Sequence, residues 1–305
     1  MRIALVTTSF PAEEGDPSGH FVQAEARRLE AQGHEVIVVM PRPGGAFGWP
    51  GVAARIRERP ARLLDAARWV MQARTRLRQI EAHRVVAHWA VPCAWPVAMG
   101  SRAELHVVSH GGDVRLLVRM PRVARERVVG AIAGRAATWT FVSEALMESL
   151  LAVLGEGARR DLARVAVVRA ATIEMPDVRA AVARKRGELG AARVAVSVGR
   201  LVRSKRVDRA IEHVARTRDI DTLVVVGDGP ERGRLEALAH ARAVDVRFVG
   251  ILPREETLAW IGAASVVLFA SQHEGASTVL REATAMGATV IMVANAEPGA
   301  TVRRE

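Results

Sequence analysis

SVVLFASQHEGASTVLREATAMGATVIMV, at residues 265–293, contains the pattern that decides the fold. The apolar run 265–270 is typical of a buried strand that ends at Ser271, a loop of small residues follows, and helical periodicity begins near Thr278. A second β-rich run, ATVIMV at 288–293, comes after that helix. A strand, a helix and another strand in this order predict a parallel sheet with a crossover helix.

The same alternation recurs along the whole chain. Further β-rich runs, with helical stretches between them, occupy residues 3–8, 35–40, 84–89, 105–110, 138–143 and 164–169, and then 194–199, 222–227 and 245–250. Residues 172–190 carry no strand signal and separate the two sets. We therefore predict an α/β protein with two doubly wound, Rossmann-like domains, residues 1–172 and 173–305, facing a cleft lined by the carboxyl ends of both sets of strands.

Composition limits the kind of protein. The chain has 305 residues, half of them apolar, and a formal net charge of +11 that attracts nucleotide diphosphates, nucleic acid or an anionic membrane surface. Cys93 is the only cysteine, which excludes an internal disulfide or a multi-cysteine metal site. No apolar run reaches the length of about 18 to 20 residues that a membrane span needs, so we expect a cytoplasmic protein.

The loop and helix after the strand at 265–270 hold the first candidate site residues. Ser277 can cap the helix, and the free N–H groups at its start can bind phosphate oxygens, which Gly275 and Ala276 allow to come close. Glu274 and Glu282 can accept hydrogen bonds from sugar hydroxyls around the same ligand. The alternative is that Glu274 is a solvated loop residue and Glu282 an ordinary helix acid near the positive end of the dipole.

Three further positions follow predicted strands. Arg200 and Lys205 flank the start of a helix, where they can neutralise a diphosphate leaving group or simply be surface cations. Gly19 belongs to a glycine loop that can lie against a phosphate or be a plain connection. His110 ends a strand beside two glycines and can hydrogen-bond a sugar hydroxyl or steer a proton, although a core histidine is the commoner case.

Other common motifs are missing from the sequence. There is no GxxxxGK[ST] phosphate loop, and GDGPERG at 227–233 does not match the GxGxxG dinucleotide fingerprint. His and Cys residues show no metal-ligand spacing, and we interpret Asp219 and Asp221 as a solvated turn.

Taken in order, the motifs resemble the retaining glycosyltransferases of the GT-B fold, in particular the large GT4-like family. The motifs are QGHEVIVV, AHWA, HGGDV, VSEAL, VGRLVRSKRVD, VVVGDGPERGRLEAL, VRFVGILP and EGASTVLREATAMGATVI, the last with its two glutamates at Glu274 and Glu282. The resemblance implies a first domain that binds the acceptor and a second that binds a nucleoside-diphosphate sugar. It implies transfer with retention of anomeric configuration, with no bound metal, in cell-envelope or polysaccharide synthesis.

The resemblance also assigns a role to each candidate residue. Arg200 and Lys205 hold the diphosphate, Glu282 the ribose hydroxyls, and Gly19 lies near the diphosphate. His110 faces the reacting sugar from the first domain. Glu274 contacts the donor sugar and phosphates together with the amides of Gly275, Ala276, Ser277, Thr278 and Val279.

Two alternatives remain open at this stage. After residue 293 the chain has only ANAEPGATVRRE, so we expect an incomplete second domain, and the chain can be a non-catalytic remnant that binds a sugar nucleotide or a protein partner. The basic, amphipathic stretch 54–84, with Leu63, Leu64, Trp69, Val70 and Leu77, can lie on anionic lipid, although packing of this stripe on the first sheet is the favoured interpretation. We do not expect nucleic acid as a partner, because no aromatic platform accompanies the charge.

Overall fold

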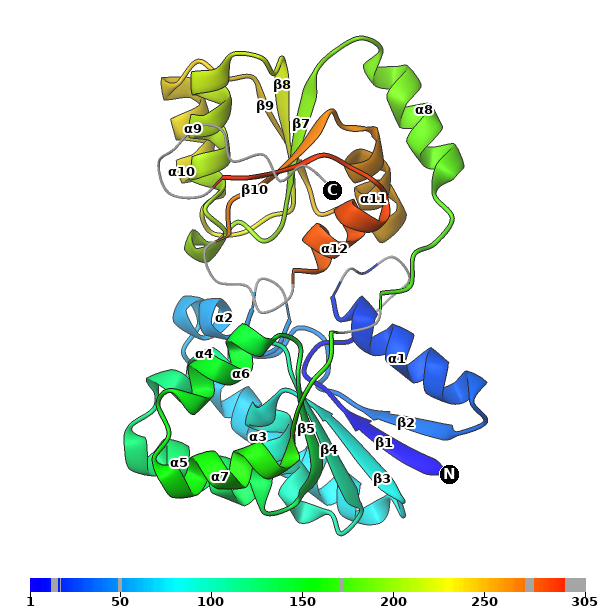
Figure 1. Ribbon diagram of the computed structural model, residues 1–305, viewed down its shortest axis with the longest axis vertical. Helices are drawn as coiled ribbons and strands as arrows, with labels where there is room; N and C mark the ends of the chain where they lie inside the picture. Colours follow the sequence, from blue (N-terminus) through cyan, green and yellow to red (C-terminus); the bar gives the residue numbers. More distant parts are fainter. Residues whose placement is uncertain (12–15, 17, 49–50, 171–172, 272–276, 294–305) are drawn as a thin grey trace. The chain divides into compact units, whose positions relative to one another are not determined.

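The computed structural model describes residues 1–11, 16, 18–48, 51–170, 173–271 and 277–293. The described residues form two compact units, one within 1–11 and 18–170 and the other made of residue 16 and the residues within 173–293. Each unit is built on its own parallel sheet (Figure 1).

The first unit has a six-stranded sheet in the order β2-β1-β3-β4-β5-β6, with every pair parallel. Its strands are β1 (Arg2–Val6), β2 (Glu35–Val39), β3 (Arg84–His88), β4 (Glu104–Ser109), β5 (Ala136–Phe141) and β6 (Ala166–Val168). Helical segments connect them: α1 (His20–Ala31), α2 (Val52–Glu58), α3 (Arg62–Gln79), η1 (Ala90–Val97), η2 (Ala98–Gly100), α4 (Gly112–Arg119), α5 (Arg122–Ala133), α6 (Glu144–Leu151) and α7 (Glu156–Val165). The strand order reverses between β1 and β3.

The core of the first unit explains why these segments form strands and helices. β1 is buried along almost its whole length, as expected for a parallel strand covered on both faces. On one side, Leu29 of α1 packs against Ile3 and Val86. In β5 the fully buried rings of Trp139 and Phe141 stack at 5.5 Å, and the indole N–H of Trp139 donates to Ser109 Oγ at 2.9 Å.

The second unit has a five-stranded sheet in the order β11-β10-β7-β8-β9, again entirely parallel. Its strands are β7 (Val194–Val198), β8 (Thr222–Val226), β9 (Val246–Gly250), β10 (Val266–Phe269) and β11 (Val290–Met292). The helices are α8 (Arg179–Leu189), η3 (Arg203–Lys205), α9 (Val207–Thr217), α10 (Arg232–Ala241), α11 (Arg254–Ala263) and α12 (Thr278–Ala285). Here the strand order reverses between β7 and β10.

Helices cover both faces of the second sheet. On one face, residues of α9 and α10 such as Ile211 and Leu235 pack against Leu223 and Leu268 of the strands. On the other face, Leu258 of α11 and Ala283 of α12 pack against Val196 and Val267. The predicted α/β class with doubly wound parallel sheets is therefore confirmed.

Close contact between two loops holds the carboxyl edge of this sheet together. Gly227 follows β8 with a φ of 131°, and a Cβ added there would lie 2.0 Å from the carbonyl oxygen of Gly199, which follows β7. Backbone hydrogen bonds join the same loops, from Gly199 N to Val226 O at 2.9 Å and from Leu201 N to Asp228 O at 2.8 Å. Only glycine fits at position 227, for steric and conformational reasons alike.

We therefore expect Gly227→Ala to lower the free energy of unfolding by about 3 kcal/mol, because the methyl group forces the two loops apart in a strained conformation. The measurement is urea denaturation followed by circular dichroism. Gly233→Ala in α10 is the matched control, because a Cβ there meets nothing within 4 Å, and we expect it to be neutral or stabilising by up to about 1 kcal/mol. Equal stability of the two variants would contradict this account of the loops.

Candidate functional site

The topology indicates where ligands bind. In open parallel sheets, ligands bind outside the carboxyl ends of the strands at the point where the strand order reverses. That point lies between β1 and β3 in the first unit and between β7 and β10 in the second. The predicted site residues that the structure describes lie in the loops and helices that follow β1, β4, β7 and β10.

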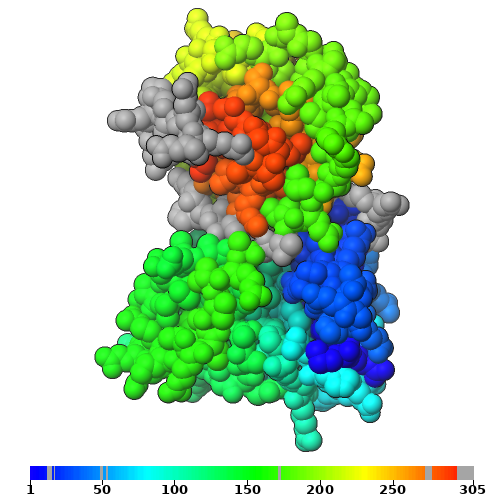
Figure 2. Space-filling model, turned by 45° about the vertical axis from the view of Figure 1, so that its right-hand side comes forward, coloured from blue at the N-terminus to red at the C-terminus, as the bar shows by residue number. Residues whose placement is uncertain are grey.

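In the second unit, helix α12 begins where the sequence predicts. Ser277 caps it, with its Oγ accepting a hydrogen bond from Leu280 N at 3.3 Å. The N–H groups of Thr278 and Val279 belong to the first turn, where the positive end of the helix dipole favours anions. Residues 277–293 form part of the surface of this unit (Figure 2, orange to red). Glu274, Gly275 and Ala276 lie outside the described residues.

Glu282 lies on the same helix and is 5% exposed, so it is not a solvated surface acid. Arg254, at the start of α11, donates to Glu282 Oε1 through Nε at 3.2 Å and Nη2 at 3.0 Å. The same guanidinium also donates to the carbonyl oxygen of Glu174. A buried carboxylate held by a cation in this way has a fixed position.

The cations Arg200 and Lys205 follow the neighbouring strand β7. The aliphatic part of the Lys205 side chain packs over Gly199, 3.7 Å from the position a Cβ would take. Ser271, after β10, donates through Oγ to the carbonyl oxygen of Ser204 at 3.4 Å. Because β7 and β10 are adjacent, the loop that carries both cations and the segment that leads to α12 meet at one edge of the sheet.

In the first unit, Gly19 is the N-cap of α1. Its φ is 69°, and a Cβ there would lie 2.2 Å from the carbonyl oxygen of Ser9. The loop after β1 is held close by Thr7, whose Oγ1 donates to that carbonyl at 2.8 Å. Glycine is therefore required for the close packing of this loop.

His110, which follows β4, forms the centre of a group of aromatic rings. Its Nε2 lies 2.9 Å from Nδ1 of His88, the last residue of β3, and the two rings stack at 5.2 Å. Phe21 and Trp89 lie against His110 at 4.7 Å and 5.0 Å between ring centroids. Trp89 has a φ of 75°, a left-handed conformation that is uncommon outside glycine and marks a locally strained site.

Asp113 ties together the two loops that carry these rings. Its buried carboxylate accepts from Ala90 N at 2.7 Å, after β3, and from Gly111 N at 3.1 Å, after β4. Charge-assisted hydrogen bonds of this kind fix the relative position of His88 and His110.

Burial decides the charge of the two histidines. Removal from water lowers the pKa of His88 to about 3. The pKa of His110 is lowered as well, first by burial and then by repulsion from His88, while Asp113 raises it. Both imidazoles are therefore neutral near pH 7 and act through hydrogen bonds.

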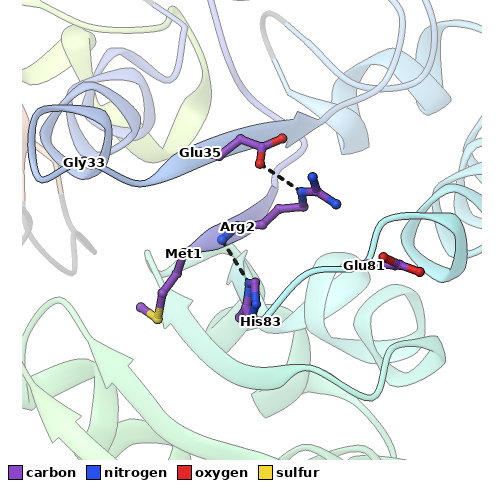
Figure 3. A pocket seen from close by; sticks show the side chains of 6 residues that line it. All are labelled: Met1, Arg2, Gly33, Glu35, Glu81 and His83. Atoms are coloured by element: carbon purple, nitrogen blue, oxygen red, sulfur yellow. Dashed lines mark hydrogen bonds and ion pairs between the residues drawn. The ribbon is translucent and has the colours of Figure 1, made fainter.

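A shallow hollow lies at the opposite edge of the first sheet, at the amino ends of the strands (Figure 3). It has a volume of about 450 Å³ and is lined by Met1, Arg2, Gly33, Glu35, Glu81 and His83. Arg2 pairs there with Glu35 at 3.0 Å and donates its backbone N–H to His83 Nδ1 at 3.0 Å. These partners satisfy one another, and none of the predicted site residues lies in this hollow.

The described residues contain no group of three or more His, Cys, Asp or Glu side chains that could hold a metal ion. Within the same residues, no helix is long and apolar enough to cross a membrane.

The fold defines an α/β protein with two doubly wound parallel sheets. Residues 179–304 match the family Glycosyl transferases group 1. The match covers most of the second unit, and the two parallel sheets have the GT-B fold of glycosyltransferases.

Relatives agree with this assignment over most of their length. The chain is similar to the Bacillus subtilis glycosyltransferase TuaC, named for teichuronic acid biosynthesis, at 23% identity over 95% of this chain and 80% of the relative. It is 28% identical, with the same coverages, to a GDP-mannose-dependent phosphatidylinositol monomannoside mannosyltransferase of Mycobacterium tuberculosis. The fold matches that of Anabaena HepE in complex with UDP and glucose, with a TM-score of 0.63 at 19% identity over 95% of this chain and 80% of that one.

Sequence reasoning missed four residues that complete these two edges: Phe21, His88, Asp113 and Arg254. His88 and Asp113 stand inside the motifs AHWA and HGGDV, so the motifs carried a signal that was not assigned to single residues. Nothing in the sequence singles out Arg254 among the many charged residues on helices.

The two neutral histidines predict how stability depends on pH. Below about pH 6.5, His88 becomes protonated in the unfolded chain but stays neutral in the folded chain. The free energy of unfolding therefore falls as the pH is lowered towards 3, and this effect is absent above about pH 7. When the pH is lowered from 7.5 to 5.0, we expect the free energy of unfolding of His88→Gln to fall by about 2 kcal/mol less than that of the unmodified chain. Removing His88 also removes its repulsion of His110, which acts in the same direction.

Urea denaturation at several pH values measures this difference. His240→Gln, at an exposed position of α10, is the matched control and should follow the unmodified chain. Parallel pH curves for the His88 variant and the unmodified chain would show that the histidines are not kept neutral by burial.

Proposed function

We propose that this glycosyltransferase transfers a sugar from a nucleoside diphosphate to an acceptor with retention of anomeric configuration, in cell-envelope or polysaccharide biosynthesis. The observation that carries the proposal is the carboxyl edge between β7 and β10, where two cations, a capped helix start and a buried carboxylate occur together. Relatives named for teichuronic acid biosynthesis and for a phosphatidylinositol mannoside support the biosynthetic setting.

The chemistry follows from the charges of these residues. When the bond between the sugar C1 and the phosphate oxygen breaks, the diphosphate leaves with added negative charge. Arg200, Lys205 and the first turn of α12 stabilise that charge, with the amides of Gly275 to Val279 contacting the phosphates. Positive potential from these groups makes a bound metal unnecessary in this proposal.

The carboxylates and the first unit bind the uncharged parts of the donor. Glu282 accepts hydrogen bonds from the ribose hydroxyls, and Arg254 keeps its side chain in place. Glu274 contacts the donor sugar. The neutral His110 and the close-packed loop at Gly19 bind the sugar and the diphosphate from the first unit, whose remaining surface takes the acceptor.

Binding of UDP and GDP by isothermal calorimetry tests this proposal. We expect one of the two nucleotides to bind, and Lys205→Ala or Glu282→Ala to weaken binding by about tenfold to a hundredfold, since each removes a charged hydrogen-bonding partner. EDTA should leave the binding unchanged. Lys185→Ala is the matched control, because Lys185 is the other lysine of the chain and pairs with Glu188 on α8.

Two results would count against the proposal. Unchanged affinity in the Lys205 and Glu282 variants would place the nucleotide elsewhere. Absence of binding by the folded chain would favour the alternative of a non-catalytic remnant. Residues 294–305, on which the expectation of an incomplete domain rests, lie outside the described residues.

A second candidate role is peripheral contact with an anionic membrane, at the inner face of the cell membrane. Trp69, Ala73 and Leu77 of α3 are buried, as the packing interpretation of this stripe expects. Leu63 and Leu64, however, are 60% and 70% exposed, which that interpretation did not predict.

The exposed face of α3 combines apolar and basic side chains. Four exposed residues lie at helical spacing on one face of the helix, opposite Trp69: Leu64, Arg68, Met71 and Arg78. Met71 is 70% exposed. Such a surface suits the boundary between anionic headgroups and acyl chains.

Vesicle sedimentation tests the membrane role. We expect the chain to bind vesicles that contain phosphatidylglycerol more strongly than pure phosphatidylcholine vesicles, and added salt to weaken the binding. The double variant Leu64→Ser, Met71→Ser should bind about tenfold less, because it removes two side chains that enter the lipid. Val123→Ser, at a 64% exposed position on α5, is the control. Equal binding by both variants would contradict a lipid contact through α3.

A further inference from the structure

Behind His110 the first unit contains two more titratable groups in a row. His88 is almost completely buried, and among the described residues its Nε2 atom has no hydrogen-bond partner. The carboxylate of Glu25 lies beside that atom, with Oε2 at 3.6 Å. This distance is longer than a hydrogen bond, and catalytic hydrogen bonds often tighten only when substrate binds.

Three separate elements supply the row. Glu25 lies on α1, His88 ends β3, and His110 follows β4. The charged groups around it are Arg28, 3.9 Å from the Glu25 carboxylate, together with Arg169 and His106, and Asp113 beside His110. The fold therefore brings the row together by tertiary packing and not by a local motif.

The shared hydrogen bond between the two imidazoles restricts where their protons can be. An ionised Glu25 can only accept, so His88 presents its proton from Nε2 and keeps a lone pair on Nδ1. His110 must then donate from Nε2 to that lone pair across the 2.9 Å contact. The Nδ1 atom of the half-buried His110 is consequently left as an acceptor.

We propose that Glu25 and His88 are positioning residues that fix His110 in the Nε2–H tautomer, so that its Nδ1 accepts a hydrogen bond from a hydroxyl of the donor sugar. This inference rests on the proposed function for the presence of a sugar, but the tautomer itself does not. Without the carboxylate, the His88–His110 pair can exist in either proton arrangement, and His110 presents a donor part of the time.

Protonation of Glu25 reverses the direction of the hydrogen bonds between Glu25, His88 and His110. A neutral carboxyl group donates to His88 Nε2, His88 then donates from Nδ1 to His110 Nε2, and His110 carries its proton on Nδ1. Burial raises the pKa of Glu25, while Arg28, Arg169 and His106 lower it. The acceptor at His110 should therefore be lost as the pH falls through the pKa of Glu25.

Long-range proton–nitrogen NMR of the imidazole rings in the ligand-free chain tests the tautomer directly. His110→Asn and His88→Asn assign the two signals. At pH 7.5 we expect both rings as single Nε2–H tautomers, and Glu25→Gln, which can donate as well as accept, should convert His110 to a mixture. Glu30→Gln, at an exposed position of α1, is the matched control. An Nδ1–H tautomer in the unmodified chain, or a His110 unaffected in Glu25→Gln, would overturn the inference.

A binding measurement adds the functional consequence. With whichever of UDP-glucose or GDP-mannose binds, we expect Glu25→Gln to raise the Kd of the sugar nucleotide about tenfold and to leave the Kd of the matching free diphosphate unchanged, because one hydrogen bond to the sugar is weakened. Equal weakening of both ligands would mean that Glu25 supports the unit generally and does not position His110. If neither sugar nucleotide binds, the proposed function fails while the NMR result still decides the tautomer.

Discussion

Two neighbouring strands of a parallel sheet can be connected only by a crossover segment, and the rest of this structure depends on that constraint. It gathers the carboxyl ends of the strands in each unit at one edge and leaves an opening where the strand order reverses. In the second unit this brings together Lys205, after β7, and the capped helix that follows β10. The site residues are therefore distant in sequence, and the sheet brings the strands that precede them to one edge.

The loops at these edges are held by short polar contacts in a buried setting. Asp113 accepts hydrogen bonds from the loop after β3 and from its own loop after β4, and Arg254 donates hydrogen bonds to Glu282 in the second unit. The carboxylates of Asp113 and Glu282 thus fix the positions of segments that carry residues we assign to donor binding. Burial has the opposite consequence for the histidines, because it keeps His88 and His110 neutral and makes their proton positions depend on hydrogen-bonded neighbours.

Most of the fold and part of the candidate site could be predicted from the sequence. Apolar runs such as 222–227 and 265–270 predicted strands because fully buried parallel strands are apolar on both faces, and Ser277 marked the start of α12. The exposure of Leu63 and Leu64 on α3 was not predicted, because periodicity does not show which of two apolar stripes faces the sheet. Glu25 and Arg254 could not be found, since their importance arises from partners 63 and 28 positions away, at His88 and Glu282.

The central claim is that the edge between β7 and β10 binds a nucleoside diphosphate. A crystal structure of the chain with UDP or GDP tests it most directly. The account predicts phosphate oxygens within hydrogen-bonding distance of Lys205 and of the first N–H groups of α12, with the ribose hydroxyls at Glu282. A nucleotide bound away from this edge, for example in the hollow around Arg2 and His83, would contradict the account.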